Sequence, residues 1–128
     1  MANTIVHFEI PADDPEELAE YYRELFGWKV QHQPEMNYWM IETVPTDAQG
    51  RPTEAGVNGG IMRRIMPEQR IMNYVGVESV DEAAARAASL GGSVLLPRQA
   101  VPGMGWFAVC QDPQGNLFGV FQEDPEAK

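Results

Sequence analysis

Asp112-Pro-Gln-Gly-Asn-Leu-Phe-Gly-Val-Phe-Gln122 is the stretch of sequence that decides the fold. Its first five residues are typical of a turn, because proline fixes φ, glycine accepts a positive φ, and Asp and Asn side chains bond to nearby backbone. The next five residues, 117–121, predict a strand that is apolar on both faces. Gly119 interrupts that apolar run, and a glycine inside a strand often marks the close approach of a ligand or of another backbone. Gly119 is therefore a candidate site residue.

The first half of the chain predicts a strand, a helix and three further strands. Residues 4–10 alternate in the strand period, which places His7 and Glu9 on the face opposite Phe8. Asp14 and the three residues after it are typical of a helix start with proline in the first turn, and Gly27 is typical of a helix end. The other strands expected in this half are 28–32, 38–44 and 57–63.

The predicted helix carries an apolar stripe along one side and acidic residues on the side facing water. The members of the stripe recur at spacings of three and four residues: Leu18, Tyr21, Tyr22, Leu25 and Phe26.

The second half repeats the pattern of the first. Residues 71–78 predict a strand, Ser79 and Glu82 form a second capping box, and an alanine-rich helix is expected over 83–90. Further strands are expected at 93–96, where Pro97 should stop the strand, at 105–111 and at 117–121. The period is about 64 residues, and neither half has enough surface to bury a core comfortably alone. We expect one domain, 1–128, built of a first module of about 1–65 and a second of about 70–123.

Composition and charge limit the classes of partner. The chain has 128 residues and 19 acidic against nine basic side chains, giving a net charge of −10. Nucleic acid and anionic membranes are therefore not expected as partners, since both need a basic footprint. Cys110 is the single cysteine, so no disulfide can form within the chain. With no secretory leader and no long apolar run in the sequence, we expect a cytoplasmic protein.

Motifs spread along nearly the whole chain resemble the vicinal oxygen chelate superfamily, also called the glyoxalase, bleomycin-resistance and extradiol dioxygenase superfamily. They are the strand of His7, the helix end at 21–27, the second helix start at 80–83 with Leu90-Gly-Gly92, and Asp112-Pro-x-Gly-Asn116. Each motif is weak alone, and their joint occurrence in this order is specific. The resemblance implies an α+β fold of two βαβββ modules with curved mixed sheets around a shared cup, in a homodimer.

Metal-dependent members of this superfamily carry ligands on the first and fourth strands of each module. His7 matches the first ligand position, whereas the second falls among residues 58–61 and the third near Met72. The fourth, a glutamate in those members, falls on Gly119. One imidazole does not make a zinc, nickel or iron site, which needs at least three suitable protein ligands. We therefore predict no metal and no other cofactor.

Candidate site residues come from strands that could face the cup. His7 and Glu9 lie two residues apart on one strand face and are candidates for an acid–base pair, although a histidine in this position is as readily a simple hydrogen-bonding residue. Tyr74, Trp106 and Gly119 complete the ligand-binding candidates. Aromatic residues on these strands also suit core or dimer packing, and the sequence alone does not fix which of them face the cup.

The function expected first is binding of a small, partly apolar molecule in the cup without the usual family metal. The alternative is a lyase or isomerase of the glyoxalase type, which would use a non-standard metal site or proton transfer by His7 and Glu9. The residues leave open whether the chain has turnover, because a shared fold does not establish a shared activity. A third possibility is a domain that acts by association alone.

Overall fold

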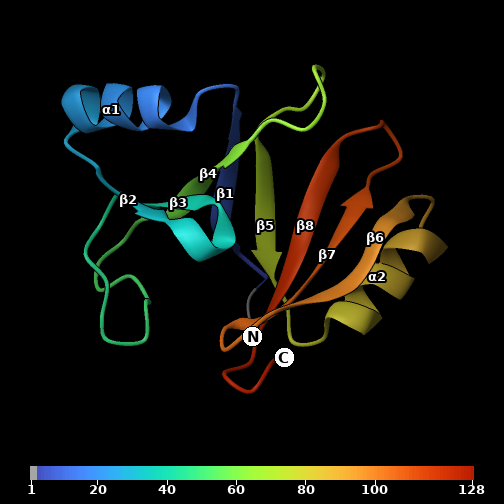
Figure 1. Ribbon diagram of the computed structural model, residues 1–128. Helices are drawn as coiled ribbons and strands as arrows, with labels where there is room; N and C mark the ends of the chain where they lie inside the picture. Colours follow the sequence, from blue (N-terminus) through green and yellow to red (C-terminus); the bar gives the residue numbers. More distant parts are fainter. Residues whose placement is uncertain (1–2) are drawn as a thin grey trace. The chain divides into compact units, whose positions relative to one another are not determined.

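The computed structural model describes residues 3–128, which form two compact units (Figure 1). The first module comprises residues 7–71, and the second comprises residues 72–128 with the start of the chain up to Val6. The start of the chain joins the second module through its backbone, because the Gly76 N–H donates a hydrogen bond to the Thr4 carbonyl at 2.8 Å.

The first module is a four-stranded mixed sheet with one α-helix. Its elements are β1 (Ile5–Ala12), α1 (Pro15–Phe26), β2 (Lys29–Gln33), a 3-10 helix η1 (Pro34–Met36), β3 (Tyr38–Glu42) and β4 (Gly59–Arg63). The strand order is β2-β3-β4-β1, with β1 parallel to β4 and the other neighbours antiparallel.

The second module repeats this arrangement with β5 (Met72–Gly76), α2 (Val80–Ser89), β6 (Ser93–Val101), β7 (Gly105–Gln111) and β8 (Leu117–Glu123). The strand order is β5-β8-β7-β6, with β5 parallel to β8 and the other neighbours antiparallel. In both modules, therefore, the first strand is parallel to the last. The predicted α+β class with two βαβββ modules is confirmed.

Each helix begins directly after its predicted capping residue, so α2 starts at Val80 and not at residue 83, where the alanine-rich helix was expected to start. The Asp14 side chain accepts a hydrogen bond from the Glu17 N–H at 3.1 Å, and the Ser79 hydroxyl accepts one from the Glu82 N–H at 3.2 Å. Such caps satisfy backbone donors that the first turn of a helix leaves without partners. At the end of α1, Gly27 adopts a left-handed φ of 72° and donates its N–H to the Arg23 carbonyl.

Each helix covers one face of its own sheet. In the first module the buried core joins Ala19 of α1 to Ile10, Trp39, Ile41 and Ile61 of the strands. In the second module, the core consists of Val80, Ala108 and Val120, with partly buried residues of α2 packed against it. Because side chains alternate along a strand, the residues between these core positions lie on the opposite face of each sheet.

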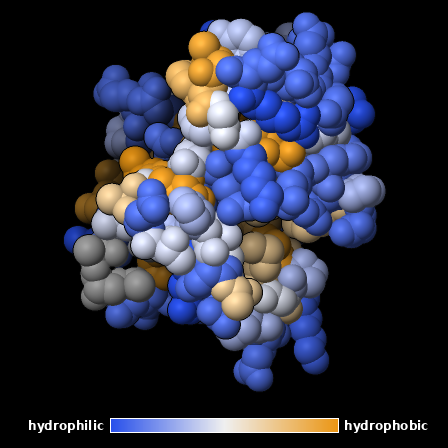
Figure 2. Space-filling model, turned by 90° about the vertical axis from the view of Figure 1, so that its left-hand side faces the viewer, coloured by the Kyte–Doolittle hydropathy of each residue, from blue (hydrophilic) through white to orange (hydrophobic). Residues whose placement is uncertain are grey.

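The apolar stripe of α1 is only partly covered. Leu18 and Tyr22 pack against the core, whereas Tyr21, Leu25 and Phe26 are each more than half exposed. Figure 2 shows hydrophobic patches separated by hydrophilic surface on the side of the molecule that it presents. Helical periodicity thus predicted the stripe, and three of its five members extend beyond the area that the sheet covers.

The expectation that Pro97 would stop the strand beginning at Ser93 was wrong, because β6 continues to Val101. Proline lacks the N–H that an inner strand needs, and an edge strand or a bulge tolerates this loss. β6 is the edge strand of the second module, and its register with β7 shifts between Val94 and Leu96 and again between Leu96 and Gln99. Pro97 lies within the second irregularity, where no regular pairing is lost.

Neither α1 nor α2 is long and apolar enough to cross a membrane, and the same holds for every helix within residues 3–128.

Candidate functional site

The sheet face of the first module that α1 does not cover carries the polar candidates, and we call it the open face. The strand register places neighbouring side chains of three strands on it. These residues are His7 and Glu9 of β1, Tyr38 and Met40 of β3, and Gly60 and Met62 of β4.

His7 and Tyr38 contact each other on the open face. The distance from His7 Nε2 to the Tyr38 hydroxyl oxygen is 2.7 Å, and the two rings stack with centroids 6.3 Å apart and planes inclined by 19°. The residues lie 31 positions apart in the chain. This hydrogen bond therefore links β1 to β3 across the strand between them.

Gly60 lies on that intervening strand and makes the contact possible. It pairs with Glu9 on one side and with Met40 on the other. A Cβ atom at position 60 would collide with the Tyr38 ring and its hydroxyl. The Tyr38 ring thus lies over β4 in the space that a side chain at position 60 would fill. The glycine at this position allows the ring to approach the backbone closely.

Burial holds His7 in its neutral form. It lowers the pKa of the His7 imidazole from 6.5 to about 4, because a buried site disfavours the charged ring. At neutral pH the ring therefore carries one N–H and one nitrogen lone pair that can accept a hydrogen bond. It can donate to or accept from Tyr38, depending on which nitrogen holds the proton.

The second module has a related contact on its own helix-free face. Tyr74 is buried, pairs in register with Gly119, and packs edge-on against Phe107 with centroids 6.3 Å apart. A Cβ atom at position 119 would collide with the Tyr74 ring. The structure thus brings Tyr74 and Gly119 together, and the room left by the missing side chain of Gly119 is taken up by this ring.

Trp106, the remaining ligand-binding candidate, does not lie beside Tyr74 and Gly119. It packs against the α2-side core of the second module, and its indole N–H donates to Asp124 at 3.0 Å. The Arg98 guanidinium lies over the ring, 4.6 Å from its centre. Neighbouring residues of a strand point to opposite faces, so Phe107 and not Trp106 lies beside Tyr74.

Sequence reasoning missed Tyr38 and Gly60 as site residues. Tyr38 is one of the strand aromatics whose sheet face the sequence leaves open, and Gly60 lies within residues 58–61, where the sequence predicts no role for it. The available signal was the combination of a strand glycine with a tyrosine in the neighbouring strand, which occurs at Gly60 and again at Gly119.

The four family ligand positions do not offer the donors of a divalent metal site. In the first module, His7 provides an imidazole, Gly60 has no side chain, and Asn58 Oδ1 already accepts hydrogen bonds from the Thr43 and Val44 N–H groups at 2.7 and 3.0 Å. In the second, Gly119 lies beneath the Tyr74 ring. Residues 3–128 contain no group of three or more His, Cys, Asp or Glu side chains arranged to hold a metal ion. The side chains at these positions therefore cannot coordinate the divalent metal that metal-dependent members of the family bind.

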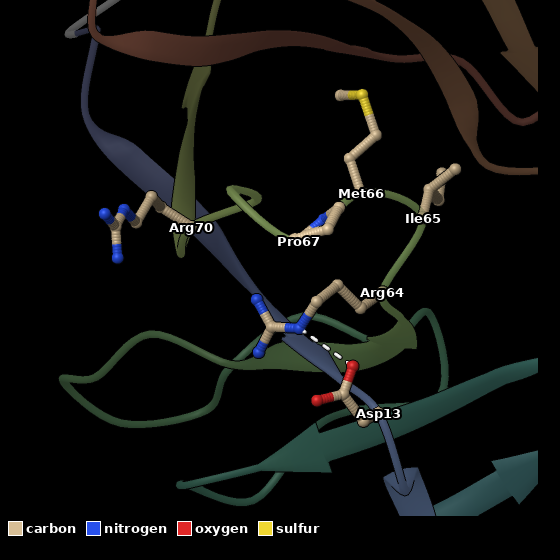
Figure 3. Close-up of a pocket in the computed structure, with 6 residues that line it drawn as sticks. All are labelled: Asp13, Arg64, Ile65, Met66, Pro67 and Arg70. Atoms are coloured by element: carbon tan, nitrogen blue, oxygen red, sulfur yellow. Dashed lines mark hydrogen bonds and ion pairs between the residues drawn. The ribbon is translucent and has the colours of Figure 1, made fainter.

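A separate pocket of about 580 Å³ lies at the segment joining β4 to β5 (Figure 3). Arg64 anchors this segment, because its guanidinium donates to Asp13 Oδ1 at 3.1 Å, to the Gln69 carbonyl at 2.6 Å and to the Pro11 carbonyl at 3.4 Å. Figure 3 shows Arg70 pointing away from Arg64, and Met66 on the other side of the segment from the ion pair. The side chains therefore do not converge on one point, and Arg64 has a structural role.

Solved structures share the fold at low sequence identity. A methylmalonyl-CoA epimerase in complex with methylmalonyl-CoA matches with a TM-score of 0.69 and 15% identity, each chain being covered completely. A glyoxalase/bleomycin resistance protein/dioxygenase superfamily member from Vibrio splendidus matches with a TM-score of 0.65 and 15% identity, over 96% of this chain and 100% of that one. At such identities the likeness concerns the fold alone.

A domain-family match identifies the family, and two curated proteins are similar in sequence. The Mycobacterium tuberculosis protein named "Putative glyoxylase CFP32" is 27% identical over 128 residues, and so is its Mycobacterium bovis counterpart. The match takes in 96% of this chain but 45% of theirs, so the chain spans about half the length of these relatives. Residues 6–121 match the glyoxalase-like domain family. The chain therefore belongs to the glyoxalase-like domain family.

Proposed function

We propose that this glyoxalase-like chain binds a small, partly apolar molecule on the open face of its first module, without the metal of its metal-dependent relatives. The observation that carries the proposal is the hydrogen bond between His7 and Tyr38 above Gly60. It sets a polar pair among the apolar Met40 and Met62 on a face that α1 leaves uncovered. A few polar groups in mostly apolar surroundings are typical of small-molecule sites.

His7 and Glu9 are the proposed polar contacts of this face, and Tyr74 is a separate ligand-binding candidate within the second module. Glu9 is half-buried and pairs in register with Gly60, and so lies next to the Tyr38 ring. Tyr74 is buried over Gly119. A homodimer and a cytoplasmic location complete the proposal; the first rests on the family resemblance and the second on the single cysteine of the chain.

Native mass spectrometry of the protein as purified tests this proposal. We expect a dimer mass, no stoichiometric metal, and either a retained small molecule or a shift when candidate ligands are added. Thermal melting with the same ligands provides a second readout, because a ligand that binds only the folded state stabilises it. One divalent ion bound per chain at full occupancy would overturn the metal-free part of the proposal.

Acid–base catalysis is the second candidate function. It is favoured by His7, which burial keeps unprotonated and which contacts the Tyr38 hydroxyl at 2.7 Å, so that a proton could pass between the two groups. Turnover of a hemithioacetal that depends on His7 and needs no added metal would support this candidate. Ligand-induced stabilisation without turnover would instead support binding alone.

A further inference from the structure

We propose that an exposed apolar patch on α1 binds a basic amphipathic segment of another protein chain. The patch consists of Tyr21, Leu25 and Phe26, each of which is more than half exposed. Residues four apart on a helix lie on the same face, so Tyr21 and Leu25 adjoin each other. Contiguous apolar surface bordered by polar residues is typical of a docking site. The patch is separate from the open face, and the inference goes beyond the proposed binding of a small molecule.

The aromatic members of the patch are held in place by neighbouring rings. Tyr21 packs edge-on against Tyr22, with ring centroids 5.3 Å apart. Phe26 lies 4.9 Å from the Trp28 ring, measured between centroids. Tyr22 and Trp28 stack on each other at 5.1 Å, and both pack against the core of the first module. Side chains that are already ordered lose little conformational entropy when a partner covers them, which suits this patch to docking.

Acidic side chains border the patch along one edge. Glu17 lies four residues before Tyr21 and Glu24 three residues after it, which places the three side chains in one row along the helix. Both carboxylates are exposed, and neither forms a salt bridge within residues 3–128. The other two acidic residues of α1 both pair with Arg23, at 3.0 Å. On α1, the carboxylates that a basic partner could neutralise are therefore those beside Tyr21.

Charge complementarity favours a basic partner over a second copy of this chain. In a homodimer formed through the patch, two-fold symmetry would bring the same surface of both copies together, and with it the carboxylates of both. Like charges set opposite each other cost binding energy, and each chain carries a net charge of −10. The proposed homodimer would then use another surface. The same carboxylates oppose contact with an anionic membrane.

A segment with apolar residues at helical spacing and lysine or arginine beside them matches this surface. Its apolar side would cover the patch, and its basic side chains would neutralise Glu17 and Glu24. The helix α1 has 12 residues and is therefore about 18 Å long, so a partner helix of roughly three turns would cover it.

Three designed peptides test the inference by fluorescence anisotropy. The first, about 14 residues long, has leucines on one helical face and lysines on the other. The second has the same composition in scrambled order, and the third has glutamate in place of every lysine. At about 0.15 M salt, we expect the first peptide to bind about fivefold more tightly than the scrambled one. The glutamate peptide should show no measurable binding.

Apolar truncations test the patch itself. Tyr21→Ala and Leu25→Ala should each weaken binding of the first peptide about fivefold, as expected for side chains at the centre of an interface. Leu95→Ala is the matched control, because Leu95 lies on β6 and is 52% exposed against 53% for Leu25. It should leave the affinity unchanged. Circular dichroism checks that each variant is folded.

Charge variants test the acidic edge. Glu17→Gln with Glu24→Gln should weaken binding of the first peptide about threefold and make it less dependent on salt. Glu54→Gln with Glu68→Gln is the matched control, since it removes two exposed carboxylates that lie outside α1. It should have a smaller effect on the affinity.

Several results would overturn the inference while small-molecule binding on the open face stands. Equal affinity for the ordered and scrambled peptides, or an equal loss in the two charge variants, would show that net charge and not the patch attracts the peptide. Equal losses in Leu25→Ala and Leu95→Ala would exclude the patch as the docking surface. Dissociation of a dimer by Tyr21→Ala in analytical ultracentrifugation would show that a second copy covers the patch.

Discussion

Gly60 and Gly119 share one structural feature, a tyrosine ring lying where a side chain would otherwise stand. The two rings come from different strands, Tyr38 from β3 and Tyr74 from β5. Position 119 is the position where metal-dependent relatives are expected to carry a glutamate. Restoring a carboxylate there would require the Tyr74 ring to move first, so a single substitution should not restore a metal site.

Replacing Gly119 with alanine should destabilise the protein. The added Cβ would collide with the buried Tyr74 ring, and overpacking of this kind costs about 1–3 kcal/mol. Urea unfolding of Gly119→Ala, of Tyr74→Leu and of the double variant measures this cost. We expect the alanine to cost less when residue 74 is leucine, because the ring that it strikes is gone. Strictly additive effects would show that the collision is not the cause.

The buried imidazole of His7 should make stability depend on pH. Its pKa is about 4 in the folded chain and 6.5 is its ordinary value, so the unfolded chain binds more protons between these values. The contribution of His7 to the free energy of unfolding has its full value above pH 6.5 and falls as the pH drops toward 4. The loss has an upper limit of about 1.4 kcal/mol per pH unit. Urea unfolding at pH 7 and pH 5 checks the sign of the change.

The control for this pH effect is His7→Gln, which keeps a hydrogen-bonding side chain beside Tyr38 but does not titrate. The carboxylates of the chain contribute equally to both proteins. The difference between the two proteins in how the free energy of unfolding changes with pH is therefore due to His7. Equal slopes in the two proteins would contradict the burial of a neutral imidazole.

At the scale of single elements, the helix boundaries were predictable and the extent of β6 was not. Asp14, Ser79 and Gly27 act through bonds to residues three or four positions away, so their effect can be interpreted from sequence alone. Whether Pro97 ends a strand depends on whether that strand is an inner or an edge strand. Edge position is a property of strand order in the whole sheet, which local sequence does not contain.

Arg64 should stabilise the segment between β4 and β5, and Arg70 should not. Arg64 makes three hydrogen bonds, to Asp13, Pro11 and Gln69, whereas Arg70 is exposed and makes no hydrogen bond or ion pair within residues 3–128. We expect Arg64→Ala to lower the free energy of unfolding by about 1–3 kcal/mol, since it leaves partly buried acceptors without a donor. Arg70→Ala is the matched control, with a change within about 0.5 kcal/mol. A similar loss in both variants would contradict the anchoring role of Arg64.

At the scale of the whole molecule, the internal repeat was the most informative part of the sequence. It predicted two modules with the same order of elements, and the structure confirms both the order and the mixed sheets. The sheet face on which each strand residue lies was less predictable. The register that sets Tyr38 above Gly60 and turns Trp106 toward α2 depends on contacts between strands distant in sequence.

The net charge of the chain predicts how its stability responds to salt. With 19 acidic and nine basic side chains, the folded state concentrates a charge of −10 that the unfolded chain spreads out. Salt screens this repulsion, since the Debye length falls from about 30 Å at 0.01 M to about 8 Å at 0.15 M. We therefore expect the melting temperature to rise by about 3 °C or more between these salt concentrations.

Glu17→Gln with Glu24→Gln in one chain provides the test of this charge effect, because both carboxylates lie on the exposed side of α1 and neither forms a salt bridge within residues 3–128. Removing them should raise the melting temperature in low salt and reduce its dependence on salt. Replacing Arg23 instead would confuse the result, because its guanidinium bonds to Glu16, Glu20 and the Val30 carbonyl. If the double variant kept the full rise of melting temperature with salt, repulsion from these two carboxylates would not be its cause. A melting temperature that fell with salt would contradict the net-charge prediction, because salt weakens attractive ion pairs.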